Sequence, residues 1–137
     1  MTGTTPIETE HLVREVTDRD FETEVEKSSQ PTVVMFYSEN CPHCRTILPY
    51  VEGFARDFRE RIRFVVMDVV ANTWTAERYG VRSTPTFKFF CHGRPVQELV
   101  GAILPAMIER YIEEFEVHGE ECIRSSTEIE YEITGYG

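Results

Sequence analysis

Hydrophobic residues occur along the chain either in short unbroken runs or in stripes with helical spacing. The runs Thr32 to Tyr37 and Arg63 to Val70 are rich in β-branched and aromatic residues, which predicts strands buried on both faces. The first should lie at the centre of a sheet. Between them, apolar residues from Ile47 to Phe58 repeat with the period of an amphipathic helix. Pro49 predicts a kink in this helix, because the apolar stripe continues beyond it.

The beginning of the chain carries a weaker pattern. His11 to Val16 alternates between apolar and polar residues, which predicts a short edge strand. Thr17 and Asp18 are side chains that can cap the N-terminus of a helix, and Phe21 and Val25 follow at helical spacing. We therefore expect a strand and then a helix before the first buried strand.

The second half predicts three further elements and then a closing helix. Trp74 to Tyr79 reads as a short helix that ends at Gly80. Thr86 to Cys91 and Pro95 to Val100 are strand-like runs whose close spacing predicts an antiparallel hairpin. A second helical stripe runs from Leu104 to Phe115 and should cover one face of the sheet. The order β-α-β-α-β-α-β-β-α predicts an α/β fold with a mixed sheet and some parallel pairing.

Length and composition fit one packed domain. The chain has 137 residues, of which 41% are hydrophobic, enough to build a core without disulfide bonds. We expect a flexible leader over residues 1–10, a domain over 11–115 and an acidic tail over 116–137. For the tail, an extra edge strand at Thr127 to Thr134 and disorder both remain open.

Charge and targeting signals exclude several classes of partner. The net charge of −10 would repel nucleic acid, and acidic residues on a solvated surface account for most of it. The sequence has no basic start followed by an apolar run and no stretch long enough to span a bilayer. We therefore expect that the protein is cytoplasmic or that a leader has been removed, and that it contacts neither nucleic acid nor a membrane.

The candidate chemistry lies in Cys41-Pro42-His43-Cys44, between the first buried strand and the amphipathic helix. A helix N-terminus offers free N–H groups and a partial positive charge, which favour a thiolate at Cys41. The intervening residues place Cys44 one helical turn away, where it can resolve a mixed disulfide formed on Cys41. The pair therefore predicts thiol–disulfide exchange.

A structural zinc site is the main alternative for these cysteines, and it needs two more ligands. Cys91 and His92 are the nearest candidates, but adjacent strand residues point to opposite faces and cannot both reach one metal ion. We therefore expect no metal. Cys91 is expected to be a small buried residue, and Cys122 to be exposed in the tail.

The remaining candidates are His43 and the segment around Pro85. His43 is either an incidental surface residue or a group that favours the neighbouring thiolate, and we prefer the second interpretation. On residue chemistry alone, Thr84-Pro85 predicts only a turn before a strand.

Several separated segments resemble the thioredoxin family, over about Val13 to Phe115. They are TVVMFYSENCPHC, Pro49 within the helix, YGVRSTPTFKFF and LVGA. The resemblance implies the thioredoxin fold, with three α/β/α layers. It also implies that Pro85 is cis and faces Cys41, and that the backbone of Thr84 pairs with a bound substrate strand.

The chain also departs from the family pattern. Met35 stands where thioredoxins usually carry a buried Asp that helps to deprotonate the resolving cysteine. Val66 stands where a Lys that partners this Asp is common. Asn40 replaces the Trp that usually precedes the first cysteine. The CPHC loop differs from the usual CGPC and resembles that of the oxidising DsbA proteins. His43 should stabilise the reduced thiolate and make the pair a stronger oxidant.

We expect a reductase of protein disulfides with Cys41 as nucleophile, Cys44 as resolving cysteine and Thr84 and Pro85 positioning the substrate. No cofactor is expected, because the chain lacks GxGxxG or another nucleotide signature. Electrons would then come from a separate reductase or a small thiol, and we expect a monomer acting on disulfide-containing client proteins. A disulfide oxidase or isomerase, and a non-catalytic adaptor, are the alternatives.

Overall fold

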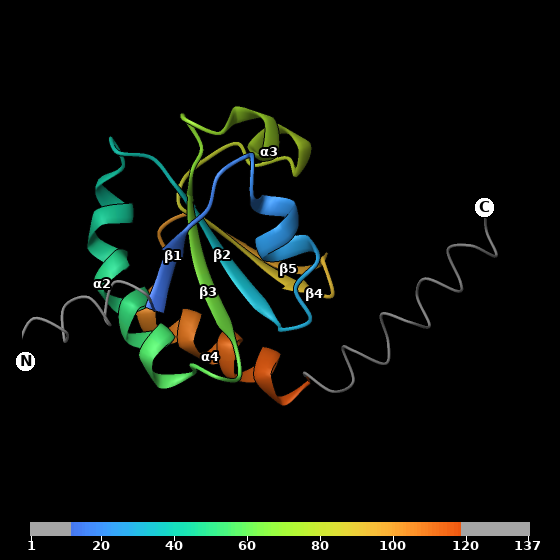
Figure 1. The fold of residues 1–137 in the computed structure, drawn as a ribbon. Helices are drawn as coiled ribbons and strands as arrows, with labels where there is room; N and C mark the ends of the chain where they lie inside the picture. The colour runs from blue at the N-terminus through green and yellow to red at the C-terminus, as the bar shows by residue number, and fades with distance from the viewer. Residues whose placement is uncertain (1–11, 119–137) are drawn as a thin grey trace, which may run out of the picture.

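The computed structural model describes residues 12–118, so the predictions for residues 1–10 and for Thr127 to Thr134 lie outside the described residues. Strands and helices alternate in the predicted order (Figure 1). The strands are β1 (Val13–Glu15), β2 (Thr32–Tyr37), β3 (Arg63–Asp68), β4 (Thr86–Cys91) and β5 (Arg94–Val100). The helices are η1 (Glu22–Glu26), α2 (Pro42–Asp57), α3 (Thr73–Arg78) and α4 (Pro105–Val117).

The five strands form one mixed sheet in the order β1-β3-β2-β4-β5. β1 and β2 run parallel to β3, whereas β4 is antiparallel to both β2 and β5. Strand β2 lies at the centre, and five of its six residues are buried. The prediction of a buried central strand, a mixed sheet and a C-terminal hairpin is therefore confirmed.

Helices α2 and α4 pack on the same face of the sheet (Figure 1). Helix α2 has 16 residues and continues through Pro49. The core under the helices joins alternate residues of β2, β3 and β4 to the apolar sides of α2 and α4, as the helical stripes predicted. Its largest contributors include Met35, Phe64, Phe87, Phe89, Phe54, Ile108 and Ile112.

The opposite face is covered by η1 and by the segment around α3 (Figure 1). Phe21, Tyr79 and Phe90 pack edge to face or tilted there, with ring centroids 5.3 to 5.7 Å apart. Such aromatic contacts contribute more than the apolar area that they bury. They hold Tyr79, the C-cap residue of α3, against the sheet.

The helix before β2 differs from its prediction. It is a short π-helical segment, closed by the hydrogen bond from Lys27 N–H to the carbonyl oxygen of Glu22 at 2.8 Å. Asp20 rather than Asp18 supplies the local carboxylate, which accepts a hydrogen bond from Thr17 N–H at 2.7 Å. The N-cap residue of η1 is Phe21, which has no side-chain cap, so the prediction that Thr17 or Asp18 caps this helix is wrong.

Asp18 instead caps α3, which lies far along the chain. Its Oδ1 accepts a hydrogen bond from Thr75 N–H at 2.9 Å, and its own N–H donates to Asn72 Oδ1 at 2.8 Å. Free N–H groups at a helix start accept such carboxylate partners from any part of the chain. This contact ties the N-terminal segment to α3.

Candidate active site

The segment between β2 and α2 carries the predicted redox pair. Cys41 is the N-cap residue of α2, with extended backbone angles, and Pro42 occupies the first turn. Cys41 and Cys44 form a disulfide, and their Cα atoms lie 5.2 Å apart. The structure therefore brings the two predicted cysteines together at a helix N-terminus.

Cys41 also has the hydrogen bond expected of a capping residue. Its Sγ accepts the backbone N–H of Cys44 at 3.1 Å, and its carbonyl accepts the N–H of Arg45 at 3.2 Å. The first turn of α2 contains no acidic residue. The local field at the Cys41 sulfur is therefore positive, which favours a negative charge there.

The residues between the cysteines face solvent. Cys41 and Cys44 are 6% and 3% exposed, whereas Pro42 and His43 are both exposed. His43 lines a groove of about 160 Å³ together with Pro85 and Leu104. The redox loop and the segment of Pro85 therefore border the same groove, although they are far apart in sequence.

The Thr84–Pro85 peptide bond is cis, as the family resemblance implied. Thr84 Oγ1 lies 3.4 Å from Ser38 Oγ in the redox loop, and Gly101 N–H donates to the Pro85 carbonyl at 2.8 Å. Among residues 12–118, no hydrogen bond occupies the backbone N–H or carbonyl of Thr84. That backbone is available to another strand.

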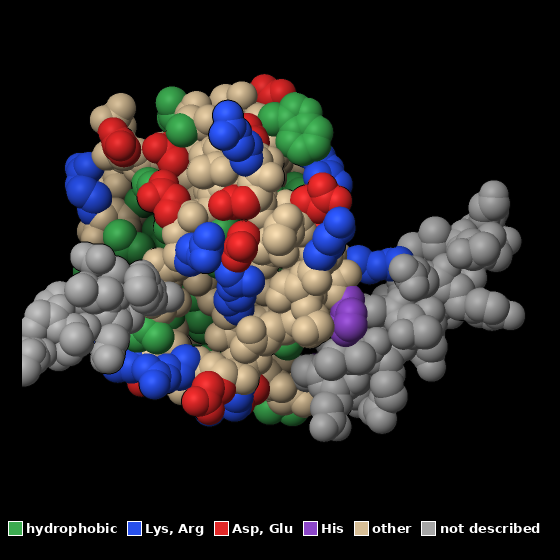
Figure 2. Space-filling model, in the orientation of Figure 1, with side chains coloured by type: hydrophobic (Ala, Val, Ile, Leu, Met, Phe, Trp, Pro, Cys, Tyr) green, Lys and Arg blue, Asp and Glu red, His purple; other side chains and the backbone are tan. Residues whose placement is uncertain are grey.

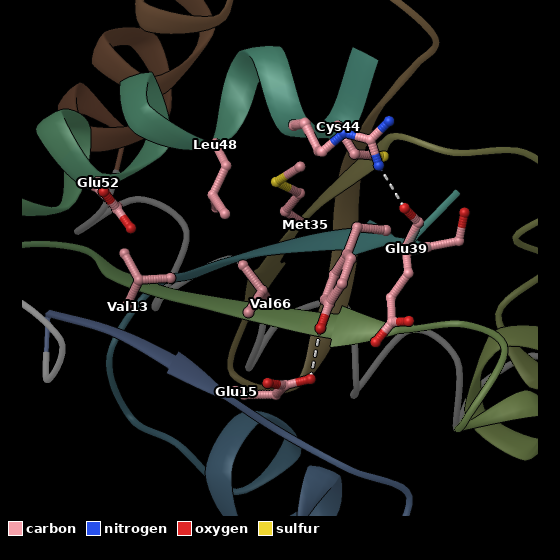
Figure 3. Close-up of a pocket in the computed structure, with 11 residues that line it drawn as sticks. Val13, Glu15, Met35, Glu39, Cys44, Leu48, Glu52 and Val66 are labelled. Carbon is pink, nitrogen blue, oxygen red and sulfur yellow. Dashed lines mark hydrogen bonds between the residues drawn. The ribbon is translucent and has the colours of Figure 1, made fainter. Parts of the chain in front are cut away.

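A cavity of about 440 Å³ lies on another side of Cys44, between α2 and the strands β1 to β3 (Figure 3). Met35 and Val66, the two predicted departures from the family, form part of its floor and are 1% and 9% exposed. The sequence identified the two substitutions but not the cavity. Finding it requires distances between segments that only the fold brings together.

The other cysteine predictions concern Cys91 and Cys122. Cys91 ends β4 and is 1% exposed, so the prediction of burial is confirmed. Its sulfur is disulfide-bonded, so Cys91 is not simply a small buried hydrophobic residue. Cys122 lies outside the described residues. Within residues 12–118, no group of three or more His, Cys, Asp or Glu side chains could hold a metal ion.

We compared the sequence with protein-family models, and the thioredoxin model matches residues 12–114. This match agrees with the fold and with the cysteine pair at the start of α2. The chain belongs to the thioredoxin family. The matched residues include β1 to β5, the redox pair and Pro85. Membership accounts for the placement of a cysteine pair at the start of α2, where it fits a dithiol–disulfide exchange active site.

Individual thioredoxins are similar over most of the domain. Thioredoxin 1 of Synechococcus elongatus is 36% identical over 88 residues, which are 64% of this chain and 82% of that protein. The thioredoxin of Pseudomonas aeruginosa is 32% identical over 104 residues, 76% of this chain and 95% of that protein. Thioredoxin M4, chloroplastic, of Arabidopsis thaliana is 34% identical over 103 residues, 75% of this chain. The match spans about half of that plant protein, 53% of its length.

Among the helices described in residues 12–118, none is long and apolar enough to cross a membrane.

Proposed function

We propose that this protein reduces disulfide bonds of client proteins by dithiol–disulfide exchange, with Cys41 as nucleophile and Cys44 as resolving cysteine. The observation that carries the proposal is the position of the Cys41 sulfur at the start of α2, where it accepts the N–H of Cys44. In the reduced protein the same N–H and the helix N-terminus favour the thiolate at Cys41. Cys44 is one turn into the helix and lacks that position.

The proposed reaction has two exchange steps. The Cys41 thiolate attacks one sulfur of the client disulfide, forming a mixed disulfide and releasing the other client sulfur as a thiolate, which takes up a proton. The Cys44 thiolate then attacks the Cys41 sulfur, forming the Cys41–Cys44 disulfide and releasing the second client thiolate. Two electrons pass from the protein to the client, and the protein ends in the oxidised form of the structure.

The groove beside His43 is the proposed binding site for the client strand. Thr84 has an unoccupied backbone N–H and carbonyl among the described residues, and Pro85 borders the groove. An extended peptide could pair with this backbone as an added strand and carry its disulfide towards Cys41. Leu104, which is 68% exposed at the same groove, offers apolar contact to the client.

His43 is proposed to support the Cys41 thiolate from the solvent side. An exposed imidazole one position before Cys44 can bring a positive charge or an N–H donor near the attacking sulfur. Stabilising the reduced form makes the pair more oxidising. The same observation therefore favours a second candidate function, the oxidation of client dithiols by the Cys41–Cys44 disulfide.

Turnover as a reductase requires an outside source of electrons. We propose a separate dithiol reductase or a small thiol, because the proposed reaction leaves Cys41 and Cys44 oxidised. A reducing compartment such as the cytoplasm is the proposed location, and a monomer the proposed state. Cell fractionation and gel filtration test these two proposals.

A trapping experiment tests the assignment of the two cysteines. The Cys44→Ser variant should accumulate a mixed disulfide with a disulfide-containing client, visible as a shifted band on a non-reducing gel that dithiothreitol removes. The Cys41→Ser variant is the matched control and should give no such band. Equal trapping by both variants, or trapping by Cys41→Ser alone, would refute the assignment.

A further inference from the structure

The cavity next to Cys44 has the dimensions of a small-molecule site. Its volume is about 440 Å³, and it lies between α2 and the strands β1, β2 and β3 (Figure 3). Protein sites for small ligands typically measure roughly 300 to 1,000 Å³. Among the described residues, none that lines this cavity belongs to the groove that Pro85 borders. It is therefore separate from the proposed client site.

The floor of the cavity is apolar. Met35 and Val66 are paired neighbours on β2 and β3, so their side chains lie together on the face that α2 covers. Val13 of β1 and Leu48 of α2 close the floor from two sides (Figure 3). A ligand in contact with these four side chains must present an apolar body.

The mouth of the cavity carries an excess of negative charge. Glu15, Glu39 and Glu52 line it, and Arg45 is the cation among the described residues of its lining. In space-filling view, hydrophobic side chains come to the surface between α2 and β1, next to acidic side chains (Figure 2). The cavity therefore joins an apolar floor to an acidic mouth.

The acidic side chains are not neutralised by neighbouring cations. Within residues 12–118, no ion pair involves Glu15, Glu39 or Glu52. The Arg45 guanidinium donates a hydrogen bond to the backbone carbonyl of Glu39 at 2.6 Å, and not to a carboxylate. The carboxylates keep their charge available to a ligand.

The hydroxyl of Tyr37 lies among the same acidic side chains. Its hydroxyl donates a hydrogen bond to Glu15 Oε2 at 2.6 Å. Burial, this hydrogen bond and the negative charges of Glu15, Asp68 and Glu39 raise the pKa of Tyr37 above its ordinary value. The phenol therefore stays neutral and leaves the negative charge of Glu15 uncompensated.

We propose that this cavity binds a small amphipathic cation, a molecule with an apolar aromatic or branched body and one ammonium or guanidinium group. The apolar body lies on Met35 and Val66, and the cationic group lies at the mouth near Glu52 and Glu15. Apolar burial supplies affinity, and charge complementarity excludes anions. This inference does not depend on the direction or the clients of the redox reaction.

A series of three indoles of similar size tests the proposal on the full chain. Tryptamine carries an ammonium group, tryptophol a neutral hydroxyl and indole-3-acetate a carboxylate. Titration followed by NMR of methyl groups should show tryptamine shifting the signals of Met35, Leu48 and Val66. Tryptophol should bind about fivefold more weakly, which corresponds to about 1 kcal/mol for an exposed charge contact. Indole-3-acetate should bind more weakly still.

Variants at the mouth separate the charge contribution from the apolar one. Glu52→Gln should weaken tryptamine by about two- to threefold, because Glu15 remains, and leave tryptophol unchanged. The matched control is Glu113→Gln, an exposed position on α4 outside the lining of the cavity, which should change neither affinity. Raising the salt concentration should likewise weaken tryptamine alone. Equal binding of the three indoles, shifts confined to other residues, or no binding of tryptamine would overturn the proposal.

Discussion

The backbone N–H of Cys44 donates a hydrogen bond to the Sγ of Cys41 at 3.1 Å, so the first cysteine of the pair caps the helix that contains the second. This relationship makes the two sulfurs unequal. A thiolate at Cys41 keeps the N–H donor and the positive end of α2, whereas a thiolate at Cys44 has neither. The predictions below follow from this asymmetry and from the surfaces around it.

Replacing His43 by Pro should make the redox pair more reducing. Loss of the imidazole removes support for the Cys41 thiolate and so destabilises the reduced form. We expect the equilibrium constant with glutathione to change by roughly tenfold, about 30 mV in reduction potential. Equilibrating the Cys41–Cys44 pair in glutathione buffers measures this change in reduction potential.

The control for that measurement is His92→Asn, which changes a histidine in the β4–β5 connection where φ is +51°. Asn tolerates this conformation. The potential of the control should match that of the wild type. A His43→Pro variant no more reducing than the wild type would contradict the role given to the imidazole.

Replacing Leu104 by Ser should impair client binding more than turnover. The side chain is 68% exposed at the groove that Pro85 borders, and losing its contact should raise KM roughly fivefold, equivalent to about 1 kcal/mol. Leu104 is the N-cap residue of α4, and Ser is a favoured residue there, so the fold should be retained.

Val117→Ser provides the comparison, because Val117 is 76% exposed at the other end of α4. Steady-state kinetics with a protein disulfide should show an unchanged KM for this variant. An equal rise of KM in both variants, or an unchanged KM in both, would argue against a client site at this groove.

Met35→Asp should destabilise the protein, by about 2 kcal/mol or more at neutral pH, because Met35 is 1% exposed within the apolar core. Burial raises the pKa of the introduced carboxyl above its unfolded value, so the folded state holds its proton more tightly. The penalty should therefore be smallest below about pH 4 and should grow as pH rises.

Urea unfolding at acidic and neutral pH measures this change. Met35→Leu keeps the volume and apolar character of the side chain and should cost less than about 1.5 kcal/mol at either pH. A penalty for Met35→Asp that does not depend on pH would contradict the burial of this position.

Much of the fold could be predicted because one residue pattern decided each major element. Four of the five buried residues of β2, Val33 to Phe36, are apolar, and the stripe of α2 continues past Pro49. Element ends were less predictable. The strand expected to reach Val70 ends at Asp68, whose carboxylate accepts the N–H of Val70 at 2.9 Å and turns the chain.

The rest of the site depends on contacts between distant segments. Asp18 caps α3 through Thr75, and the cavity next to Cys44 needs Val13 and Leu48 as well as Met35. Local spacing does not encode these contacts, because they arise only when strands pair and helices pack. Cys41 and Cys44 could be predicted because one helical turn contains both.

Tyr37 and Tyr79 should make the protein lose stability above about pH 10. Burial and hydrogen bonds to Glu15 and Glu26 raise the pKa of these phenols above their ordinary value of 10.0. Between the unfolded and folded pKa values, the unfolded chain binds fewer protons than the folded protein, so the free energy of unfolding falls as pH rises. Below about pH 10 the phenols are protonated in both states, and their contribution to stability is fully present.

The urea midpoint between pH 9 and 11 measures this loss. The Tyr37→Phe, Tyr79→Phe double variant should be less stable at pH 8, because it lacks both hydrogen bonds, but should decline less steeply above pH 10. A decline as steep as that of the wild type would show that other groups cause it.

The reduction of insulin disulfides driven by dithiothreitol tests the central claim most directly. The wild type should accelerate precipitation of the insulin B chain, and Cys41→Ser and Cys44→Ser should each reduce the rate to that of dithiothreitol alone, because a complete cycle needs both sulfurs. An inactive wild type, or a Cys41→Ser variant as active as the wild type, would contradict the assignment of Cys41 and Cys44 as a catalytic pair.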